Sequence, residues 1–217
     1  MDFEQARYNM VEQQIRPWEV LDKKVLGLMM EVRREEYVPP AYRELALADL
    51  EIPIGHGECM LSPKIEAKII QEVGLRKSDR VLEIGSGSGF LTALLAEGGQ
   101  HVYSVEIEPA LSAMAAENLK AHHVTNVTLE IGDGARGWES HGPYDVIVLT
   151  GSVPVLPESF QKSLHLGGRL FAIVGEDPIM RATLVTRTGP DTWHTEDLFE
   201  TSAPRLRNVQ NPSKFVF

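Results

Sequence analysis

The sequence has little of what secreted, membrane-spanning or nucleic-acid-binding proteins need. Among its 217 residues there is one cysteine, Cys59, so no disulfide can form within the chain. No run of 18 apolar residues exists to span a membrane, and the polar first segment lacks the apolar stretch of a signal peptide. Basic residues are also few, because 21 Lys and Arg face 31 Asp and Glu, for a net charge of −10. We therefore expect a cytoplasmic protein that binds neither membrane nor nucleic acid.

The first part of the chain reads as helices followed by a loop. Apolar spacing predicts a helix over 2–16 that ends at Pro17, a second over 21–32 and a short one over 41–48. Residues 52–63 combine two prolines and two glycines with no clean period, which indicates an irregular loop. We expect residues 1–63 to form a helical segment with this loop, and residues 64–217 to form the main domain, all within one compact body.

From residue 80 onward, strand and helix patterns alternate. Short apolar strands are expected over 81–84, 101–105, 127–131, 144–149 and 169–174, with helices over 90–96, 109–122 and 160–164 between them. The segments 182–187 and 193–201 read as an antiparallel hairpin at a sheet edge, turned by Gly189-Pro190. Such alternation is typical of a mostly parallel sheet with right-handed crossovers. The fold class is therefore α/β and Rossmann-like, with an N-terminal helical extension.

A glycine-rich turn lies directly between the first strand and the next helix. It reads Glu83-Ile-Gly85-Ser86-Gly87-Ser-Gly89. In parallel α/β sheets, ligands bind at this place, beyond the carboxyl ends of the strands. Glycines are needed because the turn is tight and the ligand must approach the backbone closely. We expect Gly85, Ser86, Gly87 and Gly89 to contact the ligand.

Acidic residues at three strand ends narrow the kind of ligand. Glu83 precedes the first glycine, where a carboxylate suits a cationic amino-acid group better than a pyrophosphate. Glu106, followed by Ile107, ends the second strand, where an acid can accept both ribose hydroxyls. Asp133 and Gly134 follow the third strand, within reach of an adenine amine. This pattern predicts an adenosyl ligand without phosphates, namely S-adenosylmethionine, with no metal.

These residues and the segments around them resemble the protein-L-isoaspartate O-methyltransferase family over most of the chain. The resemblance is carried by Met10–Ile15, by Arg34-Glu-Glu-Tyr-Val-Pro39, by Ala48-Asp49 with Ile52–Gly55, by the glycine turn, by Gly132–Gly134, by Pro143–Asp145 and by Leu166–Leu170. It implies methyl transfer from S-adenosylmethionine to the free carboxylate of an L-isoaspartyl residue in a damaged protein. The ester would then collapse to a succinimide, which allows repair. Because a carboxylate is already nucleophilic, positioning and exclusion of water supply most of the rate.

The chain departs from the family in the loop before Pro63. The family carries Thr-Ile-Ser-x-Pro, and here the residues are Cys59-Met60-Leu61-Ser62-Pro63. Leu61 therefore stands at the serine position, and a leucine cannot hydrogen-bond a carboxylate. Ser62 either takes the catalytic role through a shifted loop or caps the next helix. Met60 and Leu61 are expected to line the substrate site.

Two further residues are candidates for substrate contact. His56 lies between Gly55 and Gly57, and Arg205 lies in a tail that is more basic than the family's apolar one. Two other functions stay open. The first is a methyltransferase with a different acceptor, either a small molecule or another protein group; a hydroxyl acceptor would need a general base, for which His56 is the candidate. The second is a catalytically silent protein that only binds S-adenosylmethionine. The oligomeric state is not indicated by the sequence.

Overall fold

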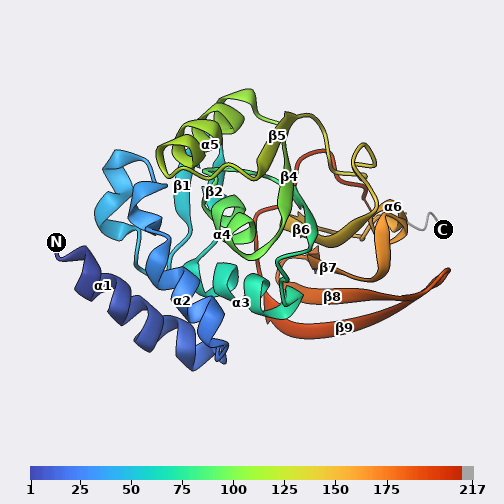
Figure 1. The fold of residues 1–217 in the computed structure, drawn as a ribbon, viewed down its shortest axis with the longest axis horizontal. Helices are drawn as coiled ribbons and strands as arrows, with labels where there is room; N and C mark the ends of the chain where they lie inside the picture. Colours follow the sequence, from blue (N-terminus) through green and yellow to red (C-terminus); the bar gives the residue numbers. More distant parts are fainter. Residues whose placement is uncertain (212–217) are drawn as a thin grey trace.

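The computed structural model of the protein describes residues 1–211, and a seven-stranded sheet forms its centre (Figure 1). The strands are ordered β5-β4-β3-β6-β7-β8-β9, and the first five of these are mutually parallel. Their bounds are β3 (Arg80–Ile84), β4 (His101–Glu106), β5 (Val127–Ile131), β6 (Tyr144–Val153), β7 (Leu164–Glu176), β8 (Ile179–Gly189) and β9 (Thr192–Thr201). The predicted Rossmann-like α/β fold is confirmed. Strand order reverses between β3 and β6, the place where such sheets bind ligands.

Helices cover both faces of the sheet. On one face lie α2 (Lys23–Glu31), α3 (Pro63–Val73), α4 (Phe90–Gly98) and α5 (Pro109–Ala121), whose apolar side chains share one core cluster with the sheet. The shorter α6 (Glu158–Lys162) packs on the other face through Phe160. The inner strands β3 and β6 are largely buried for this reason, which explains their near-continuous apolar sequence, whereas β5 at the sheet edge is only partly buried.

The first helix differs from its prediction at its end. Helix α1 (Phe3–Asn9) continues without interruption into a π-helical turn at Met10–Ile15 and a 3₁₀ turn at Arg16–Trp18. Pro17 therefore lies inside the final turn rather than terminating a helix at residue 16. The segment stops at Glu19, whose φ of 61° is left-handed. Pro17 stands within the first two positions of this 3₁₀ turn, where the fixed φ of proline is tolerated.

The segment 52–63 is not the irregular loop that its prolines and glycines predicted. It contains an antiparallel hairpin of β1 (Ile52–Gly55) and β2 (Glu58–Met60), followed by α3. Ile52 and Ile54 are buried and alternate with exposed Pro53 and Gly55. Four residues are too few for this alternation to stand out in a sequence, and Pro53 is tolerated because the sheet has only two strands.

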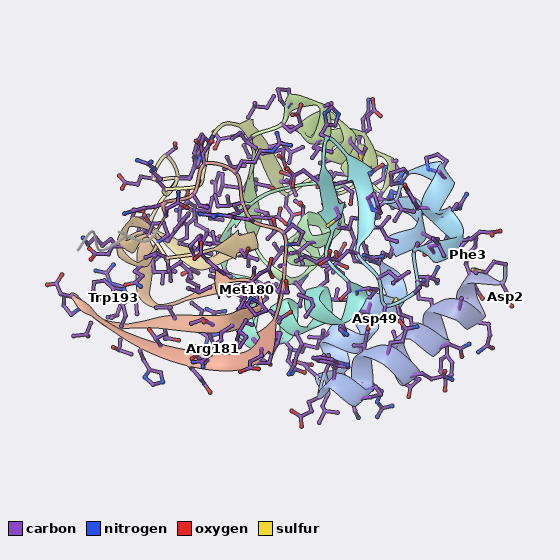
Figure 2. All side chains as sticks on the ribbon, turned by 180° about the vertical axis from the view of Figure 1, so that it is seen from behind. Asp2, Phe3, Asp49, Met180, Arg181 and Trp193 are labelled. Atoms are coloured by element: carbon purple, nitrogen blue, oxygen red, sulfur yellow. The ribbon has the colours of Figure 1, made fainter. Side chains whose placement is uncertain are left out.

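The predicted edge hairpin is confirmed as β8 and β9, which pair antiparallel along most of their length. Figure 2 shows Trp193 near the outer end of this hairpin and Met180 at its inner end. The larger core cluster includes residues on both sides of position 63, from Met10 to Ala203. The boundary at residue 63 stays a prediction. Within residues 1–211, no helix is both long and apolar enough to cross a membrane.

Candidate active site

A cleft opens at the carboxyl ends of the central strands, where the sequence placed the ligand. It encloses about 900 Å³, counting the space open to solvent at its mouth. Its walls come from the ends of β3, β4, β5 and β6, the β1–β2 hairpin, the start of α3, and a strap that we define as residues 203–208. Ten predicted site residues line it: Met60, Leu61, Gly85, Ser86, Gly87, Glu106, Ile107, Asp133, Gly134 and Arg205. Glu83, Gly89, His56 and Ser62 do not.

The glycine turn forms the floor of the cleft. Gly85 has a φ of 100°, and a Cβ there would lie 2.2 Å from Thr150 Oγ1. Any side chain would therefore displace Thr150, which donates hydrogen bonds to the carbonyls of Ile84 and Gly85. Gly89 lies at the N-cap of α4, with its Cβ position 3.2 Å from the Ala115 backbone. Gly89 thus allows close packing between α4 and α5, and its predicted ligand contact is not supported by its position.

Glu106 presents a buried carboxylate to the cleft. The residue is 5% exposed. Its Oε2 accepts a hydrogen bond from the Gly87 N–H at 3.0 Å, and its Oε1 accepts one from the Glu108 N–H at 3.1 Å. Two backbone donors fix the orientation of the carboxylate, and its remaining lone pairs can accept hydroxyl hydrogens. This arrangement suits the ribose contact expected from the sequence.

Asp133 lies at the cleft wall after β5. Its Oδ1 accepts a hydrogen bond from the Ala135 N–H at 3.0 Å. Its Oδ2 accepts one from Asn208 Nδ2, also at 3.0 Å, which ties the strap to this end of the cleft. The adenine contact predicted for Asp133 therefore competes with Asn208 for one oxygen.

Glu83 does not line the cleft, although the sequence predicted that its carboxylate would contact a cationic group of the ligand. Its side chain is fully buried below the glycine turn and does not reach the cleft. Oε2 accepts hydrogen bonds from Thr92 Oγ1 at 2.5 Å and Ser104 Oγ at 2.6 Å, and Ser104 also pairs with Ser86. Burial raises the pKa of Glu83 to about 8. A neutral acid beneath the turn cannot bind a cationic group directly, and it is no argument against a pyrophosphate.

A buried ion pair that sequence reasoning missed supports the wall at α3. Arg34 is fully buried and donates from Nε to Glu66 Oε2 at 2.9 Å and from Nη2 to the Leu61 carbonyl at 2.6 Å. Its Nη1 donates to the Ala46 carbonyl. Glu66 is 3% exposed and lines the cleft. Burial raises the pKa of Glu66 to about 7, against the lowering effect of Arg34.

Glu66 had a signal in the sequence. The buried face of α3 carries Ile65, Ile69, Ile70 and Val73. Glu66 precedes Ile69, Ile70 and Val73 at the helical spacing i, i+3, i+4, i+7 and so lies on the same face. A charged residue inside an apolar stripe indicates a buried, partnered acid.

The structure separates Leu61 from Ser62. Leu61 lines the cleft and Ser62 does not, so the shifted loop that would bring the Ser62 hydroxyl into the site is not seen. Ser62 occupies the N-cap position of α3, yet its side chain makes no capping hydrogen bond. The predicted hydroxyl cap is therefore absent too, and Pro63 at the first helical position removes one of the N–H groups that would need a cap.

The strap covers one side of the cleft. The Ser152 N–H donates to the Pro204 carbonyl at 2.8 Å, and the Leu206 N–H donates to the Ser152 carbonyl at 3.0 Å, so the strap runs along the end of β6. Arg207 then reaches across to Glu58 Oε1 at 2.7 Å and Glu108 Oε2 at 3.3 Å. Arg207 thus joins the β1–β2 hairpin to the start of α5.

Of the two further candidates for substrate contact, Arg205 and His56, only Arg205 is at the cleft. Arg205 lines it and lies 3.7 Å from Glu176. The His56 ring lies outside, with its Nδ1 3.7 Å from Glu108 Oε1. His56 takes a positive φ of 55° at the hairpin turn, and its carbonyl accepts from Arg207. Its position is that of a turn residue. Within residues 1–211, no cluster of three or more His, Cys, Asp or Glu side chains could hold a metal ion.

The sequence matches one family along most of its length. A profile of the family described as protein-L-isoaspartate(D-aspartate) O-methyltransferase (PCMT) matches residues 5–202. Protein-L-isoaspartate O-methyltransferase 1 of Rhodopseudomonas palustris (strain HaA2) is 42% identical over 197 residues, which are 90% of this chain and 80% of that protein. Protein-L-isoaspartate O-methyltransferase of Gloeobacter violaceus is 39% identical over 82% of this chain and 88% of its own length.

Solved structures agree. A structure named protein-L-isoaspartate O-methyltransferase is 27% identical with a TM-score of 0.77, and the match covers 92% of this chain and 65% of that one. A protein from Plasmodium falciparum, solved in complex with S-adenosyl-L-homocysteine, gives a TM-score of 0.79 over 95% of this chain and 99% of its own. At 21% identity, the second likeness concerns the fold alone.

Fold and cleft together define an S-adenosylmethionine-dependent methyltransferase of the Rossmann-like class, as the sequence predicted. The profile match and the identities above narrow this class further. The chain belongs to the protein-L-isoaspartate(D-aspartate) O-methyltransferase family, whose members are carboxyl O-methyltransferases.

Proposed function

We propose that this chain transfers a methyl group from S-adenosylmethionine to the free carboxylate of isoaspartyl residues in damaged proteins. The observation that carries the proposal is the cleft itself, in which Glu106, Asp133 and the glycine turn meet at adjacent strand ends. Two relatives named for this activity support the proposal, and this chain aligns with 80% or more of the length of each. A protein that only binds S-adenosylmethionine would not need the part of the cleft lined by Met60 and Leu61, where an acceptor can enter.

The residues at the cleft fit the methyl donor. Gly85 and Gly87 line the cleft without side chains, so the methionyl end can lie against their backbone. Glu106 would hold the ribose, and Asp133 with Gly134 and Ile107 would surround the adenine. When bound, S-adenosylmethionine supplies a methyl group on a positively charged sulfur. Glu83 would act from below, because its link through Ser104 to Ser86 fixes the glycine turn.

The acceptor would enter between the β1–β2 hairpin and the strap. Met60 and Leu61 offer an apolar wall that excludes water, which strengthens the attraction between the acceptor carboxylate and the donor's charge. Arg205 supplies a positive charge at the cleft wall for an anionic substrate. This proposal includes Met60, Leu61 and Arg205 as substrate contacts. It leaves out the Ser62 and His56 side chains, which lie elsewhere.

The test is release of S-adenosylhomocysteine with a short isoaspartyl peptide and with its normal aspartyl twin. The proposal expects steady turnover with the isoaspartyl peptide and none above background with the twin. Equal rates with both peptides would contradict the isoaspartyl assignment. No release with either peptide would contradict methylation of proteins at this residue.

A second candidate is a small-molecule acceptor that carries a hydroxyl. Leu61 favours it, because no hydroxyl stands at that position to bind a carboxylate. Such an acceptor needs a general base, and His56, which the sequence suggested for this task, is outside the cleft. Glu66 would have to serve instead, in its ionised form. Loss of all turnover in Glu66→Gln, with the protein still folded, would favour this candidate.

The cellular setting is part of the same proposal. We infer a cytoplasmic enzyme whose partners are isoaspartyl-containing proteins rather than membranes or nucleic acid. Its acidic balance, with 31 Asp and Glu against 21 Lys and Arg, supports this inference. The test is fractionation of native cells that express a fluorescently tagged protein. Fluorescence found only in the membrane fraction would contradict the inference.

A further inference from the structure

Glu66 is a buried acid on the cleft wall that the proposed reaction has not used. One of its oxygens, Oε2, accepts from Arg34 Nε. The other, Oε1, accepts none of the hydrogen bonds found among residues 1–211. Because Arg34 also holds the Leu61 carbonyl, one guanidinium ties Glu66 and Leu61 to the same part of the cleft. Glu66 therefore stands beside the acceptor wall.

Apart from Arg205 on the strap, which lies 3.7 Å from Glu176, this part of the cleft has few side-chain groups that can bind a carboxylate. Met60 and Leu61 have no donor in their side chains. The Cys59 thiol is directed to Glu51 Oε2 at 3.5 Å, and Thr150 donates to two backbone carbonyls. Arg207 is engaged by Glu58 and Glu108. A carboxylate acceptor in this place needs at least one donor aimed at it, since an unpaired buried charge is costly.

We propose that Glu66 binds the acceptor as a neutral carboxylic acid, whose O–H donates a hydrogen bond to the substrate carboxylate. The inference rests on the proposed carboxylate acceptor and names the residue that recognises it. The methyl group is then transferred from the sulfur of S-adenosylmethionine to the acceptor oxygen. The proton on Glu66 is not transferred to either product.

The charges around Glu66 support this assignment. The charged groups next to it are Arg34, from the 3₁₀ turn Arg34–Glu36, and Glu83, from the end of β3. The same cleft is also lined by the acids Glu58, Glu106 and Asp133 and by the cations Arg205 and Arg207. Without substrate, an ionised Glu66 balances the buried Arg34. When a substrate carboxylate arrives, two adjacent carboxylates cannot both stay ionised, and one of them takes up a proton. Arg34, a neutral Glu66 and the substrate carboxylate then sum to zero charge.

The acid–base properties of Glu66 already lie near neutrality. Burial raises its pKa to about 7 before any substrate is present, and a neighbouring substrate carboxylate raises it further. Only a small free-energy cost therefore separates the ionised form from the neutral form that donates. For an exposed glutamate, with a pKa of about 4.3, the free-energy cost of protonation at neutral pH would be far larger.

Glu66→Gln is the decisive variant, because an amide donates a hydrogen bond at every pH. For the wild type, we expect kcat/KM on the isoaspartyl peptide to fall by about tenfold or more between pH 7 and pH 9, as the free enzyme loses the proton. Glu66→Gln should retain at least about a third of the wild-type value at pH 6.5 and stay level within about twofold up to pH 9. Glu72→Gln, on the same helix but off the cleft, should follow the wild-type profile.

The outcomes separate this inference from the proposed function. A Glu66→Gln protein that binds S-adenosylhomocysteine but shows the wild-type pH profile overturns the inference, as does one that binds it and has lost turnover. In both cases isoaspartyl turnover by the wild type leaves the proposed function standing. Absence of turnover in the wild type overturns both.

A second measurement needs no variant, in case Glu66→Gln leaves Arg34 unbalanced and does not fold. Calorimetric titration of an isoaspartyl peptide into the wild-type complex with S-adenosylhomocysteine, in two buffers of different ionisation enthalpy, reports protons taken up. We expect uptake approaching one proton per peptide at pH 8. Binding without proton uptake would show that Glu66 stays ionised and would overturn the inference.

Discussion

Glu106→Ala tests the donor side of the cleft most simply. The structure places this carboxylate at the cleft wall with two backbone donors on it, from Gly87 and Glu108. Alanine removes the acceptor for the ribose hydroxyls and releases the glycine turn from its anchor. A hydrogen bond to a charged group contributes about 1.5–3 kcal/mol, so the Kd for S-adenosylhomocysteine should rise about 10- to 150-fold.

Isothermal titration with S-adenosylhomocysteine measures this change directly. The matched control is Glu117→Ala, an exposed acid on α5, which should leave the Kd unchanged. A thermal melt of both variants checks the fold, since a strand-end carboxylate is not part of the apolar core. An unchanged Kd for a folded Glu106→Ala protein would refute the assignment of the ribose site to this residue.

Three further substitutions follow from the same geometry. The pKa of Glu83 in the folded wild type, about 8, lies above its value in the unfolded chain, so the wild type loses stability as the pH rises towards 8, by up to about 1.4 kcal/mol per pH unit. Glu83→Gln removes this titration, and its free energy of unfolding in urea should fall less across pH 5.5, 7 and 8.5. An equal fall in both proteins would count against a neutral Glu83. Ser62→Ala should cost under about 0.5 kcal/mol in the same assay and nothing in turnover, because the hydroxyl neither caps α3 nor lines the cleft; a loss of turnover would show that the loop shifts. Leu61→Ser should raise isoaspartyl turnover without changing donor affinity, and a fall in turnover would show that the apolar wall matters more than an added donor.

The fold was largely predictable because its signals are local. Three of the parallel strands, β3, β4 and β5, are short runs that end at or just before a glycine or an acid in the cleft, namely Gly85, Glu106 and Asp133. The failures came where local signals were short or masked. Ile52 and Ile54 alternate over too few residues to reveal β1, and Pro17 suggested a helix end although the chain needed only a tighter turn.

The site was less predictable, because a sequence motif does not show how deeply each of its side chains is buried. Glu83 belongs to the strongest motif in the chain, yet the pleat of β3 directs its side chain below the turn, where Thr92 and Ser104 bind it. Arg34 and Glu66 are 32 residues apart and come together only when α3 packs on the segment that carries Arg34. Arg207 contacts residues about 100 and 149 positions away. Contacts of this kind depend on the finished fold.

The central claim is that this cleft moves a methyl group onto an isoaspartyl carboxylate, and tracing the methyl group tests it most directly. The protein is incubated with S-adenosylmethionine carrying a deuterated methyl group and with a peptide that contains one isoaspartyl and one ordinary aspartyl residue, and the product is sequenced by mass spectrometry. The account predicts the labelled methyl ester at the isoaspartyl residue alone, with its loss in base giving a succinimide at that position. A label on the aspartyl residue, on an amine, or on no part of the peptide while S-adenosylhomocysteine is released would contradict it.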